Sequence, residues 1–319
     1  MENVSTASNT SYWHHIDGLR AFAVLVVLFF HFNTPGFANG YLGVDIFFAI
    51  SGFLVTRLIL KDLKVHGKMR YKRFFKRRVR RLFPALAVTC IITTIFAYAM
   101  LSPERLATYG RSVASAIISV ANVNFWAESG YFDTASETKP LLHTWSLSVE
   151  EQFYLFWPVS LTIAYKYWSD RGLAILTFSA FFLSIGLIAI WKFGNFDPRS
   201  ESTIFYWMPF RVYEFMLGAM ALILYDLLQT GGTEKVQQRV QNILGFAGLG
   251  FMLAVVMTPA SIGDVPGPIL GFFACLGAVC IILSPHSWIA KTMFSWKLSR
   301  WIGRSSYSLY LVHWPIWIF

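Results

Sequence analysis

The stretch that decides the fold is the first apolar segment, which reads Ile16–Asp17–Gly18–Leu19–Arg20, then ten apolar residues, and then His31. On a helix turning about 100° per residue, Arg20 and His31 lie within roughly 20° of one another, and Asp17 can meet Arg20 as an i,i+3 pair. A charged side chain at mid-bilayer costs about 2.5–3.5 kcal/mol, so such residues usually face a bundle interior. We therefore expect a membrane-spanning helix with a functional polar face. The alternative is that Asp17 and Arg20 only anchor the helix at the membrane interface.

Composition indicates the class of protein. Hydrophobic residues make up 55% of the 319 residues and charged residues only 14%, whereas a soluble domain carries about 25% charged residues. We predict an all-α, polytopic transmembrane bundle of about ten spans in one domain, 16–319, after a polar N-terminal segment, 1–15, that lacks the features of a signal peptide. The apolar windows are 16–33, 40–60, 83–101, 111–126, 145–165, 172–192, 203–225, 242–258, 266–284 and 304–319.

The distribution of the net charge of +10 indicates the orientation. Between Arg57 and Arg81 there are twelve Lys or Arg residues and one acid. Positive loops stay in the cytoplasm, so this loop and the N-terminus are predicted to be cytoplasmic. The later basic loops at 166–171 and 291–304 would also be cytoplasmic if window 111–126 is re-entrant, and external if it is a full span. Charge alone leaves this open.

The end of the basic run is denser than a topology signal requires. Arg77, Arg78 and Arg81 are spaced so that their guanidinium groups can line one face of a juxtamembrane helix. Such groups suit bidentate contacts with phosphate, from either a specific phosphate-bearing ligand or membrane lipid headgroups. Nucleic-acid binding is a weak alternative, because the run adjoins membrane spans and lacks a reader domain, and we expect no nucleic-acid partner.

A candidate general base lies at the far end of the first span. The short polar turn 33–39 is expected to bring Asp45, near the start of the second span, close to the depth of His31. A carboxylate that holds one imidazole nitrogen leaves the other free to accept a proton. We therefore predict that His31 and Asp45 act together.

Further polar chemistry is found around residues 141–154. Glu150 follows His143 by two helical turns on the same face, which makes an acid/base pair possible, with a helix cap as the alternative. Glu151 points about 100° away from Glu150, so only one of the two carboxylates faces a given site. Two i,i+3 pairs come later in the chain, Arg211 with Glu214, interpreted as a structural ion pair, and Tyr310 with His313.

Several site classes are excluded. The chain has no Gly-x-Ser-x-Gly and no His-Glu-x-x-His motif, which argues against a serine hydrolase or a zinc protease. Cys90, Cys275 and Cys280 fall in apolar windows without ligand spacing, so we expect small core residues, no disulfide framework and no metal site.

Taken together, the motifs resemble the integral-membrane acyltransferase family 3. The resemblance rests on five blocks that occur in the family's order along nearly the whole chain. They are Asp17–Gly18–Leu19–Arg20 with Arg-x10-His to His31; Gly43–Val44–Asp45–Ile46–Phe47–Phe48 with Ser51–Gly52–Phe53; Arg77–Arg78–Val79–Arg80–Arg81–Leu82–Phe83–Pro84; Trp145–Ser146–Leu147–Ser148–Val149–Glu150–Glu151–Gln152–Phe153–Tyr154; and Ser306–Tyr307–Ser308–Leu309–Tyr310–Leu311–Val312–His313.

This resemblance implies a ten-span enzyme of the bacterial inner membrane. Such an enzyme moves an acyl group, most often acetyl, from cytoplasmic acyl-CoA to a hydroxyl of an extracytoplasmic glycan, lipid-linked or on the surface, such as lipopolysaccharide O-antigen. It also implies that Arg77, Arg78 and Arg81 meet the CoA phosphates and that activity depends on Arg20 and His31. The chemistry is consistent, since acyl transfer needs a base, positive character for an oxyanion and an anion site.

The sequence leaves open whether a further domain takes part and whether the chain is an enzyme. The apolar run reaches the last residue, Phe319, a pattern expected of a fragment, and family members often continue into a further span and an extracytoplasmic SGNH-type hydrolase domain. Whether such a domain, fused or separate, completes the transfer is undecided. A proton-coupled membrane transporter would also place Asp, Glu, Arg and His inside spans, and a non-catalytic sensor would tolerate the loss of His31.

Overall fold

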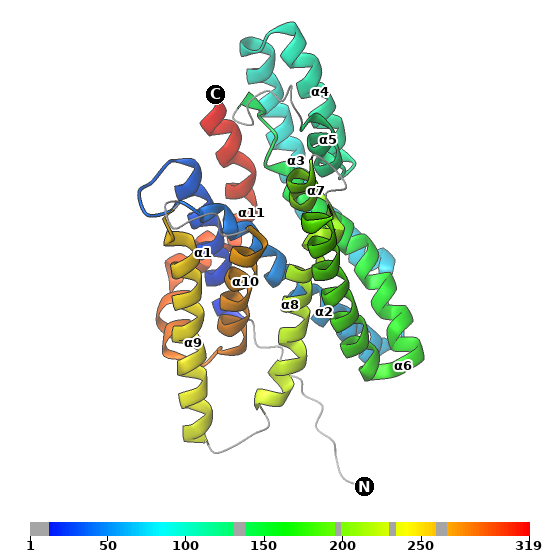
Figure 1. Ribbon diagram of the computed structural model, residues 1–319, viewed down its shortest axis with the longest axis vertical. Helices are drawn as coiled ribbons and strands as arrows, with labels where there is room; N and C mark the ends of the chain where they lie inside the picture. Colours follow the sequence, from blue (N-terminus) through cyan, green and yellow to red (C-terminus); the bar gives the residue numbers. More distant parts are fainter. Residues whose placement is uncertain (1–12, 130–137, 195–198, 230–233, 260–266) are drawn as a thin grey trace.

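The computed structural model describes residues 13–129, 138–194, 199–229, 234–259 and 267–319. Within these ranges every regular element is helical, which confirms an all-α bundle (Figure 1). Most of the predicted N-terminal segment, 1–15, lies outside the described residues. The elements are α1 (His14–His31), η1 (Gly40–Leu42), α2 (Gly43–His66), α3 (Tyr71–Met100), α4 (Pro103–Ile117), α5 (Ala121–Glu128), α6 (Thr144–Phe193), α7 (Ser200–Tyr206), α8 (Met208–Gln229), α9 (Glu234–Met257), α10 (Gly267–Leu283), η3 (Ala290–Phe294) and α11 (Lys297–Ile318).

Six helices of the described part are long and apolar enough to cross a bilayer, namely α1, α2, α3, α6, α8 and α9. Helix α6 is 50 residues long and bends at Ser169, whose φ of 49° is not helical, so its two arms form two rods. The apolar α10, with 17 residues, is slightly shorter than a usual span. About ten spans stays a prediction, because length and composition identify fewer.

The apolar window 111–126 is not a single span. Helix α4 ends at Ile117, Ser119 has a φ of 59°, and α5 then runs for only eight residues. Helices of 15 and eight residues are about 22 and 12 Å long, short of the roughly 30 Å hydrocarbon core. Of the two alternatives, the full span is therefore wrong.

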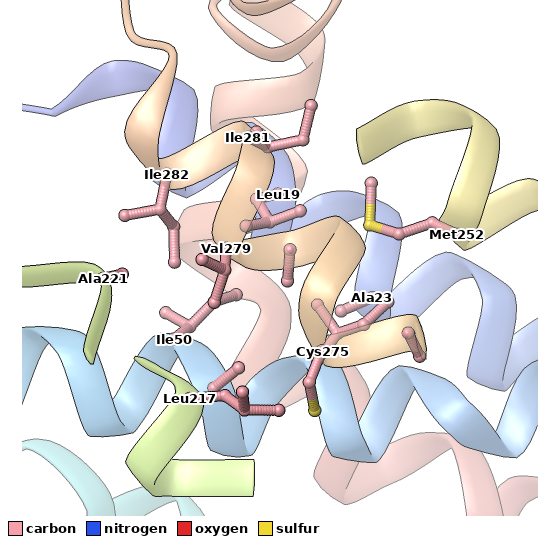
Figure 2. Close-up of a cluster of buried hydrophobic side chains, with 14 of the residues drawn as sticks. Leu19, Ala23, Ile50, Leu217, Ala221, Met252, Cys275, Val279, Ile281 and Ile282 are labelled. Atoms are coloured by element: carbon pink, nitrogen blue, oxygen red, sulfur yellow. The ribbon is translucent and has the colours of Figure 1, made fainter. Parts of the chain in front are cut away.

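The core forms around α2, which packs against α1, α6, α8 and α10. Figure 2 shows part of it: Leu19 and Ala23 of α1, Ile50 of α2, Leu217 of α8 and Cys275 of α10 point into one cluster. All three cysteines are free and buried, as expected of small core residues. The apolar faces thus converge on a helix that carries both Asp45 and Ser51.

A close crossing holds α1 against α11, the two helices that carry His31 and His313. A Cβ atom on Gly303 of α11 would overlap the carbonyl oxygen of Asp17, and one on Gly18 would overlap that of Phe294 at the end of η3, just before α11. Small residues let two backbones approach in this way. The crossing therefore sets the distance between the polar groups on the two helices.

The basic segments gather at one end of the molecule. Lys64, at the end of α2, pairs with Asp170 at the bend of α6 (2.8 Å), and Arg304 of α11 lies 3.5 Å from Asp17 near the start of α1. At the opposite end the α1–α2 connection meets α9, since the side chain of Asn39 donates to the Val255 carbonyl (3.1 Å). The α1–α2 connection and the C-terminus lie toward the top of Figure 1.

Candidate functional site

A pocket opens among five helices and collects much of the polar chemistry. It contains about 630 Å³ of space free of atoms, part of it open to the surroundings. Its polar lining residues come from α1, α2, α3, α6 and α11, and they are Arg20, Ser51, Arg78, Arg81, Ser146, Glu150, Tyr154, Ser306, Tyr307 and Tyr310. Concave sites with a few convergent polar groups are typical of small-molecule binding.

One wall of the pocket is cationic. Arg78 lies over the Tyr154 ring, with its guanidinium carbon 3.6 Å from the ring centroid, and Arg81 follows one turn later. Arg77 is exposed and is not among the lining residues. Arg20 also lines the pocket and lies 3.7 Å from Asp17, so the predicted i,i+3 pair does form. Three guanidinium groups therefore face the pocket, from two helices.

Glu150 faces the same pocket with two hydroxyl partners. Ser51 and Tyr154 both hydrogen-bond Oε1 of Glu150, and the two hydroxyl oxygens are 3.0 Å apart. Glu151 is not among the lining residues, as expected of neighbouring helical positions. The predicted pairing of His143 with Glu150 is wrong, because Glu150 bonds Ser51 and Tyr154, and neither ring nitrogen of His143 has a hydrogen-bond partner among the described residues.

Tyr310 also lines the pocket. Its hydroxyl is 2.7 Å from the hydroxyl of Ser146 and donates to the His143 carbonyl at 3.2 Å. Its ring centroid lies 5.3 Å from that of His313, so the predicted i,i+3 neighbours are in contact. Tyr310 thus separates the arginine-lined pocket from a group of histidines.

The histidines come from α1, α11 and the turn that precedes α6. His31 at the end of α1 and His313 of α11 have ring centroids 5.1 Å apart, and His143, just before α6, lies 5.6 Å from His313. Both ring nitrogens of His143 are buried and have no hydrogen-bond partner among the described residues. In the described part of the chain, no three His, Cys, Asp or Glu side chains are placed to hold a metal ion.

The predicted pairing of Asp45 with His31 is wrong. A Cβ atom on Gly43 would overlap the Ala23 carbonyl oxygen, so α2 begins beside the middle of α1. Ala23 lies about 12 Å from His31 along the axis of α1. Asp45 instead accepts a hydrogen bond from Arg211 (3.0 Å), which also pairs with Glu214 (3.1 Å). A guanidinium stabilises a buried carboxylate better than a neutral imidazole does.

Sequence reasoning missed several polar residues of this site. Ser51, Ser146 and Tyr154 lie within quoted motifs but were not singled out for a role. The four-residue step from Glu150 to Tyr154 was a usable signal, because i,i+4 side chains meet on a helix. Ser51 and Ser146 gave no such signal, since their partners belong to other helices.

Comparison with known proteins identifies the class as a membrane-embedded acyltransferase. Residues 13–319 match the family described as "Acyltransferase domain", and the chain belongs to this family, in agreement with the resemblance drawn from its motifs. No solved structure matches the chain.

Named relatives extend this finding. The chain is 31% identical over 322 residues to "Peptidoglycan O-acetyltransferase OatA" of Listeria monocytogenes, covering 98% of this chain and 50% of the relative. It is 32% identical over 313 residues to "O-acetyltransferase OatA" of Staphylococcus aureus, covering 95% of this chain and 50% of the relative. YrhL of Bacillus subtilis is 28% identical over 309 residues, which cover 94% and 48%. The chain spans about half the length of these curated relatives.

Proposed function

We propose that this chain transfers an acetyl group from cytoplasmic acetyl-CoA to a hydroxyl of an extracytoplasmic glycan. The observation that carries the proposal is a pocket lined by three arginines and by Tyr310, whose ring contacts two of the histidines. The names of the Listeria monocytogenes and Staphylococcus aureus relatives specify O-acetyl transfer, and that of the Listeria monocytogenes relative also specifies peptidoglycan. They favour peptidoglycan over lipopolysaccharide O-antigen as the glycan class.

The donor would enter from the arginine side. Arg78 and Arg81 supply the charge-assisted contacts that a nucleotide phosphate needs, and the apolar pocket walls suit the pantetheine arm. The basic segments share this end of the molecule, and positive segments favour the cytoplasm, where acetyl-CoA is made. The predicted role of Arg77 in CoA binding is not carried into this proposal, because Arg77 does not line the pocket.

The acceptor would meet the thioester near His31, about 16 Å along α1 from Arg20. His31 takes the proton of the acceptor hydroxyl, whose oxygen attacks the acetyl carbonyl carbon. A new C–O ester bond forms, the C–S bond breaks, and the CoA thiolate leaves and takes up a proton. The nucleotide has no need to cross the membrane in this arrangement.

The test is reconstitution of the purified chain in vesicles with radiolabelled acetyl-CoA and a lipid-linked peptidoglycan precursor. We expect label on the glycan and release of CoA, with a loss of about 10²–10⁴-fold in His31→Ala. His286→Ala is the matched control, because that side chain is exposed at the other end of the bundle. Acceptor flux without label transfer would instead support a transporter. An unchanged transfer rate in His31→Ala would refute the role of His31 as the general base.

A further inference from the structure

The orientation of His31 follows from a short chain of hydrogen bonds that begins at a backbone carbonyl. Nδ1 of His313 lies 2.6 Å from the carbonyl oxygen of Tyr310. A carbonyl oxygen only accepts hydrogen bonds, so this ring nitrogen must carry the proton. In a neutral imidazole the other nitrogen, Nε2, then holds a lone pair.

The contact between His313 and His31 fixes the proton on the second ring. Nε2 of His313 lies 3.2 Å from Nδ1 of His31. Since His313 presents a lone pair at this contact, His31 must present its N–H there. The lone pair of His31 is therefore on Nε2, the nitrogen that faces away from His313.

The surroundings restrict both rings. His313 is buried, with 3% of its surface exposed, and the ring of Trp314 packs edge-on against His31 at 4.7 Å. Trp314 is itself held, because its indole N–H donates to the Lys139 carbonyl (2.8 Å). Rotation of the His31 ring would break the bond to His313 and the contact with Trp314.

We propose that His313 is the positioning residue that sets the tautomer of His31 and so directs its basic Nε2 toward the acceptor hydroxyl. This deepens the proposed function and rests on His31 being the base. His313 takes the place that Asp45 was predicted to hold, with a neutral ring instead of a carboxylate. When His31 takes up a proton, its Nδ1–H still points at the lone pair of His313, so the imidazolium keeps its hydrogen bond.

Two substitutions separate orientation from simple packing. His313→Gln keeps a side-chain oxygen that can accept from Nδ1 of His31, whereas His313→Met has similar length without a strong acceptor. We expect kcat to fall about 10–100-fold in His313→Met, with the KM for acetyl-CoA unchanged, and His313→Gln to recover most of the loss. Equal losses in both variants would assign His313 to packing and refute the proposal.

The second measurement needs no turnover. ¹⁵N NMR of histidine-labelled protein in bilayers reports the tautomer of each ring, and the His31 signal is assigned by its loss in His31→Gln. We expect the parent and His313→Gln to show His31 protonated on Nδ1, and His313→Met to lose this preference. A parent with His31 protonated on Nε2 would overturn the proposal even if no variant can be purified. An Nδ1–H tautomer in a chain that transfers no acetyl would refute the proposed function and leave the orientation of His31 standing.

Discussion

At the residue scale, the arginine block shows how adjacent side chains of one type come to differ. Arg78 and Arg81 line the pocket, and Arg78 is also held over the Tyr154 ring. Arg77 is exposed and does not line the pocket. A step of one residue turns a side chain by about 100° around the helix, so two of these three arginines share the pocket face.

This difference predicts the effect of charge removal on donor binding. Replacing Arg78 and Arg81 together with Gln should raise the Kd for acetyl-CoA about 10²–10⁴-fold, because hydrogen bonds to charged groups contribute about 1.5–3 kcal/mol each. Arg77→Gln should leave it within about twofold. Calorimetry on protein in nanodiscs measures both, and added salt should weaken the parent's binding. An equal effect of Arg77→Gln would show that the three arginines act only as a topology signal or as contacts for lipid headgroups.

At the element scale, the crossing of α1 and α11 determines whether the histidines meet. The backbones touch at Gly303 and Asp17, about one turn from the arginine pocket's Ser306 and ten residues before His313. Because both helices are rigid rods, a shift at this contact is carried along α11 to its far end. The geometry between His31 and His313 therefore depends on a glycine that lies far from both.

We predict that Gly303→Ala destabilises the fold by about 1–3 kcal/mol, because the added methyl group must displace the α1 backbone. It should also slow acetyl transfer, since α11 moves relative to α1. Gly250→Ala in α9 is the matched control: nothing lies within 4 Å of its added Cβ, and alanine favours a helix by about 1 kcal/mol. Thermal unfolding in detergent compares the two. Equal unfolding temperatures for parent and Gly303→Ala would show that the crossing is not tight.

At the scale of the whole molecule, the charge distribution and the site have the same polarity. The α2–α3 loop, the bend of α6 and the start of α11 lie at one end with the arginine wall, and His31 lies toward the other end. A donor and an acceptor that enter from opposite ends would meet inside the bundle. This arrangement predicts a definite sidedness for the surface residues.

Cysteine labelling tests that sidedness. All three positions are exposed, Lys68 and Lys297 at the basic end of the bundle and Ala38 at the opposite end. Lys68→Cys and Lys297→Cys should therefore react with an impermeant thiol reagent only from the cytoplasmic side, and Ala38→Cys only from the outside. The parent is the control, since its Cys90, Cys275 and Cys280 are buried. Labelling of Ala38→Cys from the cytoplasmic side would place the base on the donor side and remove the case for transfer across the membrane.

The sequence by itself determined the class of protein and the contacts within each helix. Composition indicated a helical membrane bundle, and the motif order indicated the acyltransferase family, both of which are confirmed. The pairs Asp17 with Arg20 and Arg211 with Glu214 were predictable from spacing alone. The reason is physical: the period of 3.6 residues per turn settles which side chains meet on a single helix.

Only the tertiary structure decided which side chains meet between helices. Asp45 binds Arg211 instead of His31, and His31 meets His313, which is 282 residues away in the chain. These contacts depend on the depth at which α2 starts beside α1 and on the crossing of α1 with α11. Both are set by where backbones can approach closely, at Gly43 and Gly303, and helical periodicity carries no information about the relative height or rotation of two packed helices.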